Sequence, residues 1–153
     1  MRYLICLLAI CFFMSCSSSR KATSNNVYSS NTPTQSASPF PMLNNYTFKL
    51  TEISTDETYG YTTENPVKVG GVGWGPENER RYLNALTGPN GEEITYHRLG
   101  SCCPFNTPNG IMGGGMLDRY EIKYKGLSKP IIIYINMYDQ DHLKAPKGLK
   151  YKE

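Results

Sequence analysis

The stretch that decides the fold is LDRYEIKYKGLSKPIIIYINMY, residues 117–138. Its first half alternates, so that Tyr120, Ile122 and Tyr124 fall on one face of an extended chain and charged residues on the other. This period of two is typical of a strand with one buried face. The second half is a continuous apolar run, as expected for a central strand covered on both sides. Residues 126–129 between them predict a short hairpin connection.

Three other segments have the composition of strands: YTFKLTEI at residues 46–53, PVKVGGV at 66–72 and EEITYHRL at 92–99. The first alternates apolar with polar residues, and the third is enriched in strand formers. In the second, Pro66 limits the segment to a strand start or a sheet edge.

One helix is predicted to begin at Gly75. Pro76 suits its first turn, Glu77 and Glu79 suit its positive end, and residues 87–89, Thr-Gly-Pro, would end it. Within this span one apolar stripe has helical spacing: Tyr82, Leu83 and Leu86. We therefore expect an α+β domain, a small, mostly antiparallel sheet of about five strands with one helix packed on it.

An alternative interpretation makes RYLNAL, residues 81–86, a strand that a hairpin turn at Asn90-Gly91 joins to EEITYHRL. The proline at the start, the glycine at the end and the placement of the acidic residues favour the helix. The sequence alone leaves residues 81–87 open between the two.

The N-terminus carries an export signal. A basic start is followed by an apolar run over residues 4–14 and then by Ser15 and Cys16. The run is shorter than the roughly 18 to 20 residues that a permanent membrane helix needs, so residues 1–15 are predicted to be a signal peptide. FMSC, residues 13–16, resembles the lipobox of bacterial lipoproteins, whose cysteine is acylated after cleavage. Cys16 is thus the predicted lipidation site, with ordinary cleavage as the alternative.

The rest of the chain divides in two. Residues 16–44 are predicted to be the lipidated cysteine followed by a flexible tether, because Ser, Thr, Asn and Pro dominate them. A coil of this length spans about 30 Å. Residues 45–153 are predicted to form a single domain that is large enough to fold around one core.

The charge of the chain is nearly balanced. Once Arg2 is removed with the signal peptide, 15 basic residues stand against 13 acidic ones. This balance argues against nucleic acid as a partner, and export argues against it again.

Two glycine-rich segments are candidate ligand loops. VGGVGWGP, residues 69–76, has the order of a phosphate-binding loop but neither of its standard spacings. We therefore interpret it as a turn, with Trp74 covering the core. NGIMGGGML, residues 109–117, would let the backbone approach a ligand or the neighbouring CCP segment.

Cys102 and Cys103 in GSCCPF are the thiols that remain after cleavage and acylation. We expect a disulfide between them in the turn after EEITYHRL, because the compartment is oxidising and each has the other as its partner. Neighbouring cysteines close a strained ring. Buried free thiols are a second interpretation.

Catalysis and zinc binding are the remaining interpretations of the two cysteines. His97 or His142 could serve as a base for a thiol nucleophile or complete a set of zinc ligands. No hydrolase context surrounds the cysteines, and a C-x-x-C spacing is absent. No catalytic, metal-binding or cofactor-binding residues are therefore assigned, and no cofactor is expected.

Tyrosine is abundant, at 12 of 153 residues. Exposed tyrosines often make ligand or partner surfaces, whereas core tyrosines have a satisfied hydroxyl, and both interpretations stay open. Four of them fall on the predicted adjacent strands: Tyr120, Tyr124, Tyr134 and Tyr138.

The lipobox, the tether and the segments ERRYLNALTGPNGEE, YHRLGSCCPF and GGGMLDRYEI resemble a family of small, uncharacterised bacterial lipoproteins. Some members carry the label 2-dehydro-3-deoxyphosphooctonate aldolase. That enzyme is a TIM barrel, which needs about 250 residues, so the label is not supported here. The resemblance implies an envelope lipoprotein and transfers no catalytic residue.

These observations predict a membrane-anchored lipoprotein of the cell envelope, in the outer membrane and facing the periplasm. Its domain is expected to be a non-enzymatic binding or structural module for a protein or glycan partner. The alternative is a thiol- or metal-dependent envelope enzyme centred on Cys102, Cys103 and His97.

Overall fold

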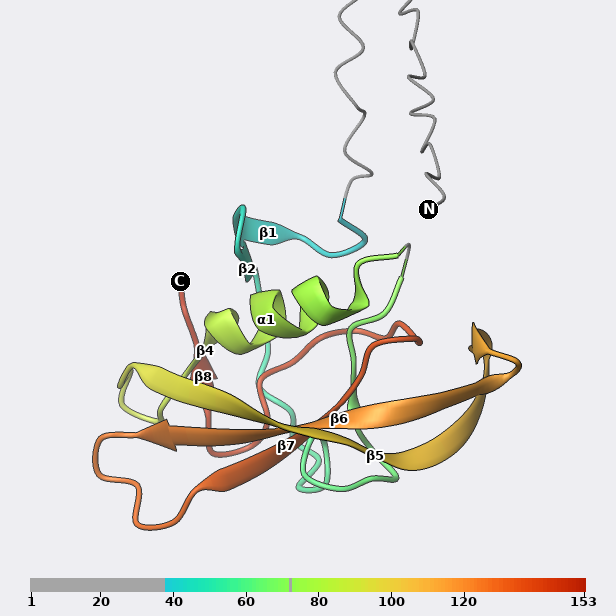
Figure 1. Cartoon of the computed structure of the whole chain (residues 1–153). Helices are drawn as coiled ribbons and strands as arrows, with labels where there is room; N and C mark the ends of the chain where they lie inside the picture. The colour runs from blue at the N-terminus through green and yellow to red at the C-terminus, as the bar shows by residue number, and fades with distance from the viewer. Residues whose placement is uncertain (1–37, 72) are drawn as a thin grey trace, which may run out of the picture. The chain divides into compact units, whose positions relative to one another are not determined.

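A computed structural model describes residues 38–71 and 73–153 (Figure 1). The predicted signal peptide and Cys16 lie outside the described residues, as does most of the predicted tether. Within the described ranges, every helix is too short or too polar to cross a membrane.

The main sheet has four strands in the order β3-β7-β6-β5. These strands are β3 (Val67–Lys68), β7 (Ile131–Asn136), β6 (Gly114–Tyr124) and β5 (Ile94–Ile111). β5 pairs with β6 and β6 with β7 in antiparallel fashion, whereas β3 runs parallel to β7. The α+β prediction with a mostly antiparallel sheet is therefore confirmed.

Helix α1 (Gly75–Ala85) begins and ends close to the predicted positions. Pro76 occupies its first turn together with Glu77, and Leu86 is extended after the last turn. The helical interpretation of RYLNAL is thus confirmed up to Ala85, while Leu86–Thr87 forms the short strand β4. In Figure 1, α1 lies across one face of the sheet, between the sheet and the hairpin of β1 (Met42–Asn44) and β2 (Thr47–Phe48).

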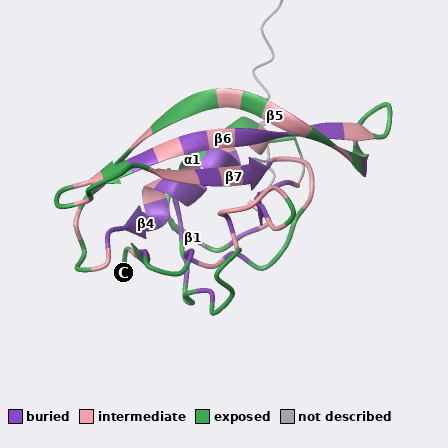
Figure 2. Cartoon of the chain, turned by 90° about the horizontal axis from the view of Figure 1, so that it is seen from below, coloured by how far each residue is buried: buried purple, intermediate pink, exposed green. Residues whose placement is uncertain are grey.

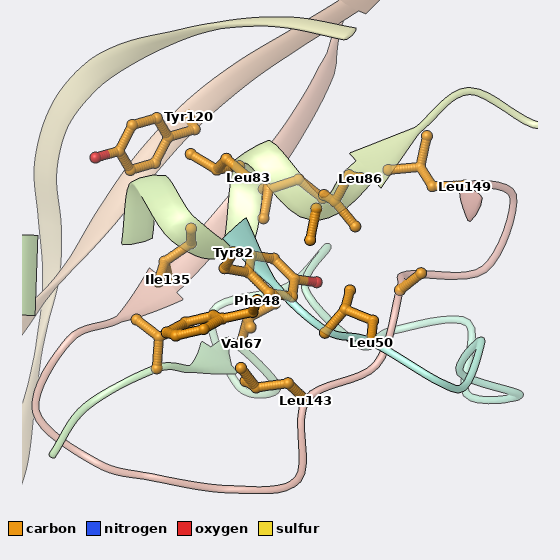
Figure 3. Packing of buried hydrophobic residues seen from close by; sticks show 14 of the residues in the cluster. Phe48, Leu50, Val67, Tyr82, Leu83, Leu86, Tyr120, Ile135, Leu143 and Leu149 are labelled. Carbon is orange, nitrogen blue, oxygen red and sulfur yellow. The ribbon is translucent and has the colours of Figure 1, made fainter. Parts of the chain in front are cut away.

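The core lies between α1 and the sheet (Figure 3). The predicted stripe of Tyr82, Leu83 and Leu86 is fully buried. Full burial of a large apolar side chain contributes about 1.5–3 kcal/mol, so this stripe fixes the helix on the sheet. The Tyr82 hydroxyl donates a hydrogen bond of 2.8 Å to the carbonyl oxygen of Lys144, so its polar end is satisfied.

Two sheet predictions need qualification. Ile133 and Ile135 of β7 are buried against the helix layer, but Ile132 and Tyr134 on the other face are only half-buried. The apolar run is therefore covered fully on one side. In residues 46–53, only Thr47–Phe48 form a strand. The backbone groups of Lys49 and Glu52 form hydrogen bonds to loop residues instead.

The expected tether of residues 16–44 is shortened by the structure. Phe40 is only 8% exposed, and its ring centroid lies 5.0 Å from that of Phe48. β1 pairs with β2 next to it. An aromatic side chain that can be buried is held in the core even within a polar stretch, so the domain includes residues 40–44.

The expected turn at GSCCPF is wrong. β5 runs without interruption through both cysteines and forms one long hairpin with β6. Gly100, with a φ of 116°, and Cys103, with a φ of 57°, stand at the register shifts, so the strand absorbs the two irregular positions as bulges. The turn lies instead at Met112-Gly113, between Ile111 and Gly114.

A two-stranded sheet joins the end of the chain to the end of the helix. β4 pairs with β8 (Lys150–Tyr151) in antiparallel fashion. Figure 2 shows buried residues along α1, β6 and β7, and mostly exposed or half-buried residues along β5. β5 is therefore the open edge of the main sheet.

Candidate binding site at the end of the hairpin

The β5–β6 hairpin extends past the rest of the sheet (Figure 1). β7 pairs with β6 only as far as Asp118, which lies opposite Ile135. Residues 114–117 of β6 therefore continue beyond β7 by about 13 Å at the usual rise of a strand. We call residues 102–117 the hairpin end. The charge-free run is slightly longer, because residues 99–117 contain no Asp, Glu, Lys, Arg or His.

The two cysteines lie at the base of the hairpin end. Cys102 is paired with Leu117 and Pro104 with Met116, so Cys103 is the extra residue of a bulge. Both cysteines are half-buried, and their sulfur atoms are at disulfide-bonding distance. The GGGML segment and the CCP segment thus lie side by side, which agrees with their expected closeness.

A shallow hollow of about 530 Å³ opens on the hairpin end. The Phe105 and Tyr138 rings meet edge to face with centroids 6.0 Å apart. Gly115 lies between them, and a Cβ atom there would come within 2.9 Å of both rings. All the lining residues are uncharged: Pro104, Phe105, Asn106, Gly114, Gly115, Met116 and Tyr138.

One carboxylate fixes the hairpin end to the loop after β7. Asp139 Oδ1 accepts hydrogen bonds from Thr107 Oγ1 at 2.5 Å and from Asn109 Nδ2 at 2.9 Å, and Oδ2 accepts one from Asn136 Nδ2. Burial disfavours the charge of Asp139, but these hydrogen bonds outweigh it and hold its pKa below the ordinary value. Charge-assisted hydrogen bonds to Asp139 therefore hold the hairpin end, and with it the hollow, against the loop after β7.

A second polar cluster holds α1 to the base of the same hairpin. Glu79 and Asp118 are almost completely buried, and Tyr120 donates a hydrogen bond of 2.8 Å to Glu79 Oε2. Arg98 binds Asp118 through Nε at 2.7 Å and Nη2 at 2.8 Å, and Ser101 Oγ donates to the same carboxylate at 2.7 Å.

Burial raises the pKa of Glu79 to about 8, and the neighbouring charge of Asp118 adds to the effect. Burial also opposes the charge of Asp118, but hydrogen bonds from Arg98 and Ser101 hold its pKa below the ordinary value. Glu79 Oε1 accepts no hydrogen bond from the described residues.

The residues of the alternative enzyme site do not converge in the described structure. His97 is exposed and lies opposite Glu121 on β6, five positions along the strand from Cys102. His142 lies 3.1 Å from Glu52 in a different part of the domain. Over residues 38–71 and 73–153, no group of three or more His, Cys, Asp and Glu is arranged to hold a metal ion.

The four tyrosines do not form one surface. Tyr120 is buried under α1 and binds Glu79, while Tyr124 packs at the edge of the same core. Tyr134 points from β7 toward the other face, and Tyr138 lines the hollow. Only Tyr138 thus contributes to the candidate site.

Trp74 does not cover the core. It is exposed at the N-terminal end of α1, and the Arg81 guanidinium lies over its ring at 5.9 Å. The glycine-rich segment before it borders another hollow, shared with the hairpin end through Asn109 and Tyr138. The two glycine-rich segments are therefore neighbours in space.

A larger hollow of about 800 Å³ lies beside the first described residues, from Pro39 to Pro41. Lys49, Asp141 and His142 line it together with apolar side chains. One wall of this hollow is formed by residues 39–41 at the start of the described chain. The shape of the hollow therefore depends on the path of this segment.

Sequence reasoning missed the Glu79 cluster, although the signal was present. Glu79 precedes Tyr82, Leu83 and Leu86 by three, four and seven residues, which places it on the buried stripe. An acidic residue also suits the positive N-terminal end of a helix. This explanation left the place of Glu79 on the buried stripe unrecognised.

Compared with protein families, curated proteins and solved structures, the chain has no match. The expected resemblance to small bacterial lipoproteins therefore stays a prediction.

Proposed function

We propose that this chain is a lipid-anchored protein of the cell envelope whose folded domain is a non-enzymatic binding module, and that its ligand is an uncharged glycan. The observation that carries the proposal is the uncharged hollow at the hairpin end, with Phe105 and Tyr138 in its wall.

The chemistry of the hollow suits a neutral sugar. A sugar ring has C–H faces that pack on aromatic and thioether groups, which Phe105, Tyr138 and Met116 supply. Its hydroxyl groups need neutral donors and acceptors, which the Asn106 carboxamide and the backbone at Gly114 and Gly115 supply. An ionic ligand would find no charge to pair with in this wall.

A peptide bound by strand addition is a weaker candidate for the same place. β5 is the open edge, but Pro104 and Pro108 have no N–H group to donate to an added strand. The bulges at Gly100 and Cys103 also break the regular spacing that an added strand requires. Side-chain recognition in the hollow is therefore favoured over backbone pairing.

The membrane anchor is supported by the sequence. The apolar run of residues 4–14 and the FMSC motif support acylation of Cys16. Ser17 follows instead of Asp, which favours the outer membrane and a periplasmic domain. Acyl labelling of the wild type and of Cys16→Ala tests the proposed anchor. Equal labelling of the two would contradict acylation at Cys16.

Glycan binding is tested with neutral oligosaccharides by saturation-transfer NMR and calorimetry. Wild type should bind, and Asn106→Ala and Tyr138→Ala should each weaken binding by at least about tenfold, the effect of losing roughly 1.4 kcal/mol. Tyr46→Ala is the matched control, because Tyr46 is exposed away from the hollow. Absence of binding, or equal loss in the control, would contradict the proposal. Binding of envelope peptides at the same residues would replace the glycan by a protein partner.

A further inference from the structure

The tip of the β5–β6 hairpin presents two large apolar side chains to solvent. Ile111 is 84% exposed and Met112 is 101% exposed. Isolated exposed apolar residues are common, but two in succession at a projecting tip are a candidate contact surface. Met112 also has a φ of 56° and Gly113 a φ of 79°, the geometry of a two-residue hairpin turn that favours Asn or Gly. The turn therefore holds a methionine where glycine or asparagine would be less strained.

The hairpin that carries the tip has no charged side chain of its own. Residues 99–117 contain no Asp, Glu, Lys, Arg or His, so Ile111 and Met112 can enter an apolar medium without burying a charged side chain of this hairpin. Asp139, from the loop after β7, accepts hydrogen bonds from Thr107 and Asn109, which precede the tip by a few residues. These bonds hold the hairpin end against the body of the domain.

The start of the described chain lies near the same end of the domain. Pro39 packs on Gly71, where a Cβ atom would come within 3.1 Å of the proline ring. Gly71 lines the same hollow as Asn109 of the hairpin end. The predicted tether from Cys16 therefore enters the domain near the end that carries the tip.

We propose that Ile111 and Met112 insert into the lipid bilayer to which the chain is tethered, so that the domain has a second, non-covalent membrane contact. This inference rests on the proposed anchor at Cys16, but not on glycan binding. If the 21 residues from 17 to 37 are the coil that their composition predicts, they would span about 25 Å, enough for the tip to reach the surface of its own membrane. Two side chains bind a bilayer weakly by themselves, and the high local concentration given by the anchor makes the contact effective.

The test uses a chain from residue 17 onward, because every residue of the hydrophobic core lies between Phe40 and Leu149. An N-terminal hexahistidine tag holds it on phosphatidylcholine vesicles that contain nickel-chelating lipid. This attachment does not depend on natural acylation, so a failure of the lipoprotein proposal does not affect the result.

A single tryptophan reports on the tip. Met112→Trp in a Trp74→Phe background should show a blue-shifted emission and strong quenching by brominated lipid. Adding Ile111→Ser should reduce the quenching by at least about half. The matched control is Tyr46→Trp in the same background, because Tyr46 is also exposed but lies by the β1–β2 hairpin.

A tip that inserts gives quenching at position 112 and none at position 46. Equal quenching at the two positions, or none at 112 while the protein is held on the vesicle, overturns the proposal. Circular dichroism of each variant confirms that the fold is kept.

Discussion

Tyr120 on β6 donates a hydrogen bond of 2.8 Å to the buried carboxyl group of Glu79 on α1. Burial and the neighbouring charge of Asp118 raise the pKa of Glu79 to about 8, so its neutral form is favoured at neutral pH. Arg98 and Ser101 bind the Asp118 carboxylate. The contact between the helix and the hairpin base therefore contains a buried group whose charge depends on pH.

The first prediction concerns pH. The pKa of Glu79 is raised to about 8 in the fold, from an ordinary value of 4.5. The folded protein thus holds a proton that the unfolded chain has lost, so the contribution of Glu79 to stability is complete below pH 4.5 and is lost as the pH rises through 8. Urea denaturation at several pH values in this window should show the free energy of unfolding falling as the pH rises, by at most about 1.4 kcal/mol per pH unit.

Glu79→Gln is the control for that slope. The amide keeps the shape and its oxygen can accept the hydrogen bond from Tyr120, but it does not titrate. Its stability should change much less over the same pH range. Asp118 acts in the opposite sense, because its pKa is lowered, and its contribution is lost only below its ordinary value of 3.8. If the free energy of unfolding falls with pH equally in wild type and Glu79→Gln, the group that titrates is not Glu79.

The second prediction concerns Arg98. Its guanidinium binds the buried Asp118 carboxylate with two hydrogen bonds. Arg98→Ala should leave a buried charge without its partner and lower the free energy of unfolding by about 2–4 kcal/mol. Lys123→Ala, which removes an exposed ion pair with Glu121, should cost under about 1 kcal/mol. Chemical denaturation measures the free energy of unfolding of both variants. Equal losses would show that the Arg98–Asp118 ion pair contributes no more than the exposed pair.

The third prediction concerns the hollow. A Cβ atom on Gly115 would lie 2.9 Å from the Phe105 and Tyr138 rings, whereas one on Gly114 would meet its nearest neighbour at 3.8 Å. Gly115→Ala should therefore displace the rings and destabilise the domain by about 1–3 kcal/mol. Gly114→Ala should be close to neutral. Near-ultraviolet circular dichroism follows the rings, and an unchanged Gly115→Ala spectrum would contradict the packing.

The fourth prediction concerns the cysteines. We expect Cys102 and Cys103 to be oxidised to each other in the predicted oxidising compartment, because they are the two thiols that are expected to remain after cleavage and acylation. Mass analysis after alkylation should find modified thiols only after reduction. So small a loop constrains little of the unfolded chain, and reduction should cost at most about 1–2 kcal/mol. Two thiols that are alkylated without reductant would rule the disulfide out.

The sequence predicted the parts of the fold that depend on local periodicity. Alternation placed Tyr120 and Ile122 on the buried face, and the spacing of Tyr82 and Leu83 placed the helix on the sheet. These signals are local, because one face of a strand or helix must be apolar wherever it is buried.

The remaining features depend on contacts between distant segments. Gly100 and Pro104 flank the cysteines as turn residues would, yet pairing with β6 keeps the chain extended and turns the irregular positions into bulges. Phe40 enters the core from a stretch of tether-like composition because Phe48 lies beside it. The hollow between Phe105 and Tyr138 joins residues from two elements and has no pattern in either.

The parallel pairing of β3 with β7 and the pairing of β4 with β8 have a consequence for how the protein is made. Leu86 lies opposite Tyr151, and the Tyr151 hydroxyl binds the carbonyl oxygen of Thr51 at 2.9 Å. The second half of the chain is thus needed to complete layers that the first half begins. Non-local pairing of this kind slows folding. A nascent chain that lacks its last residues cannot form the β4–β8 pair, so this part of the domain is completed only when the C-terminal residues have been made.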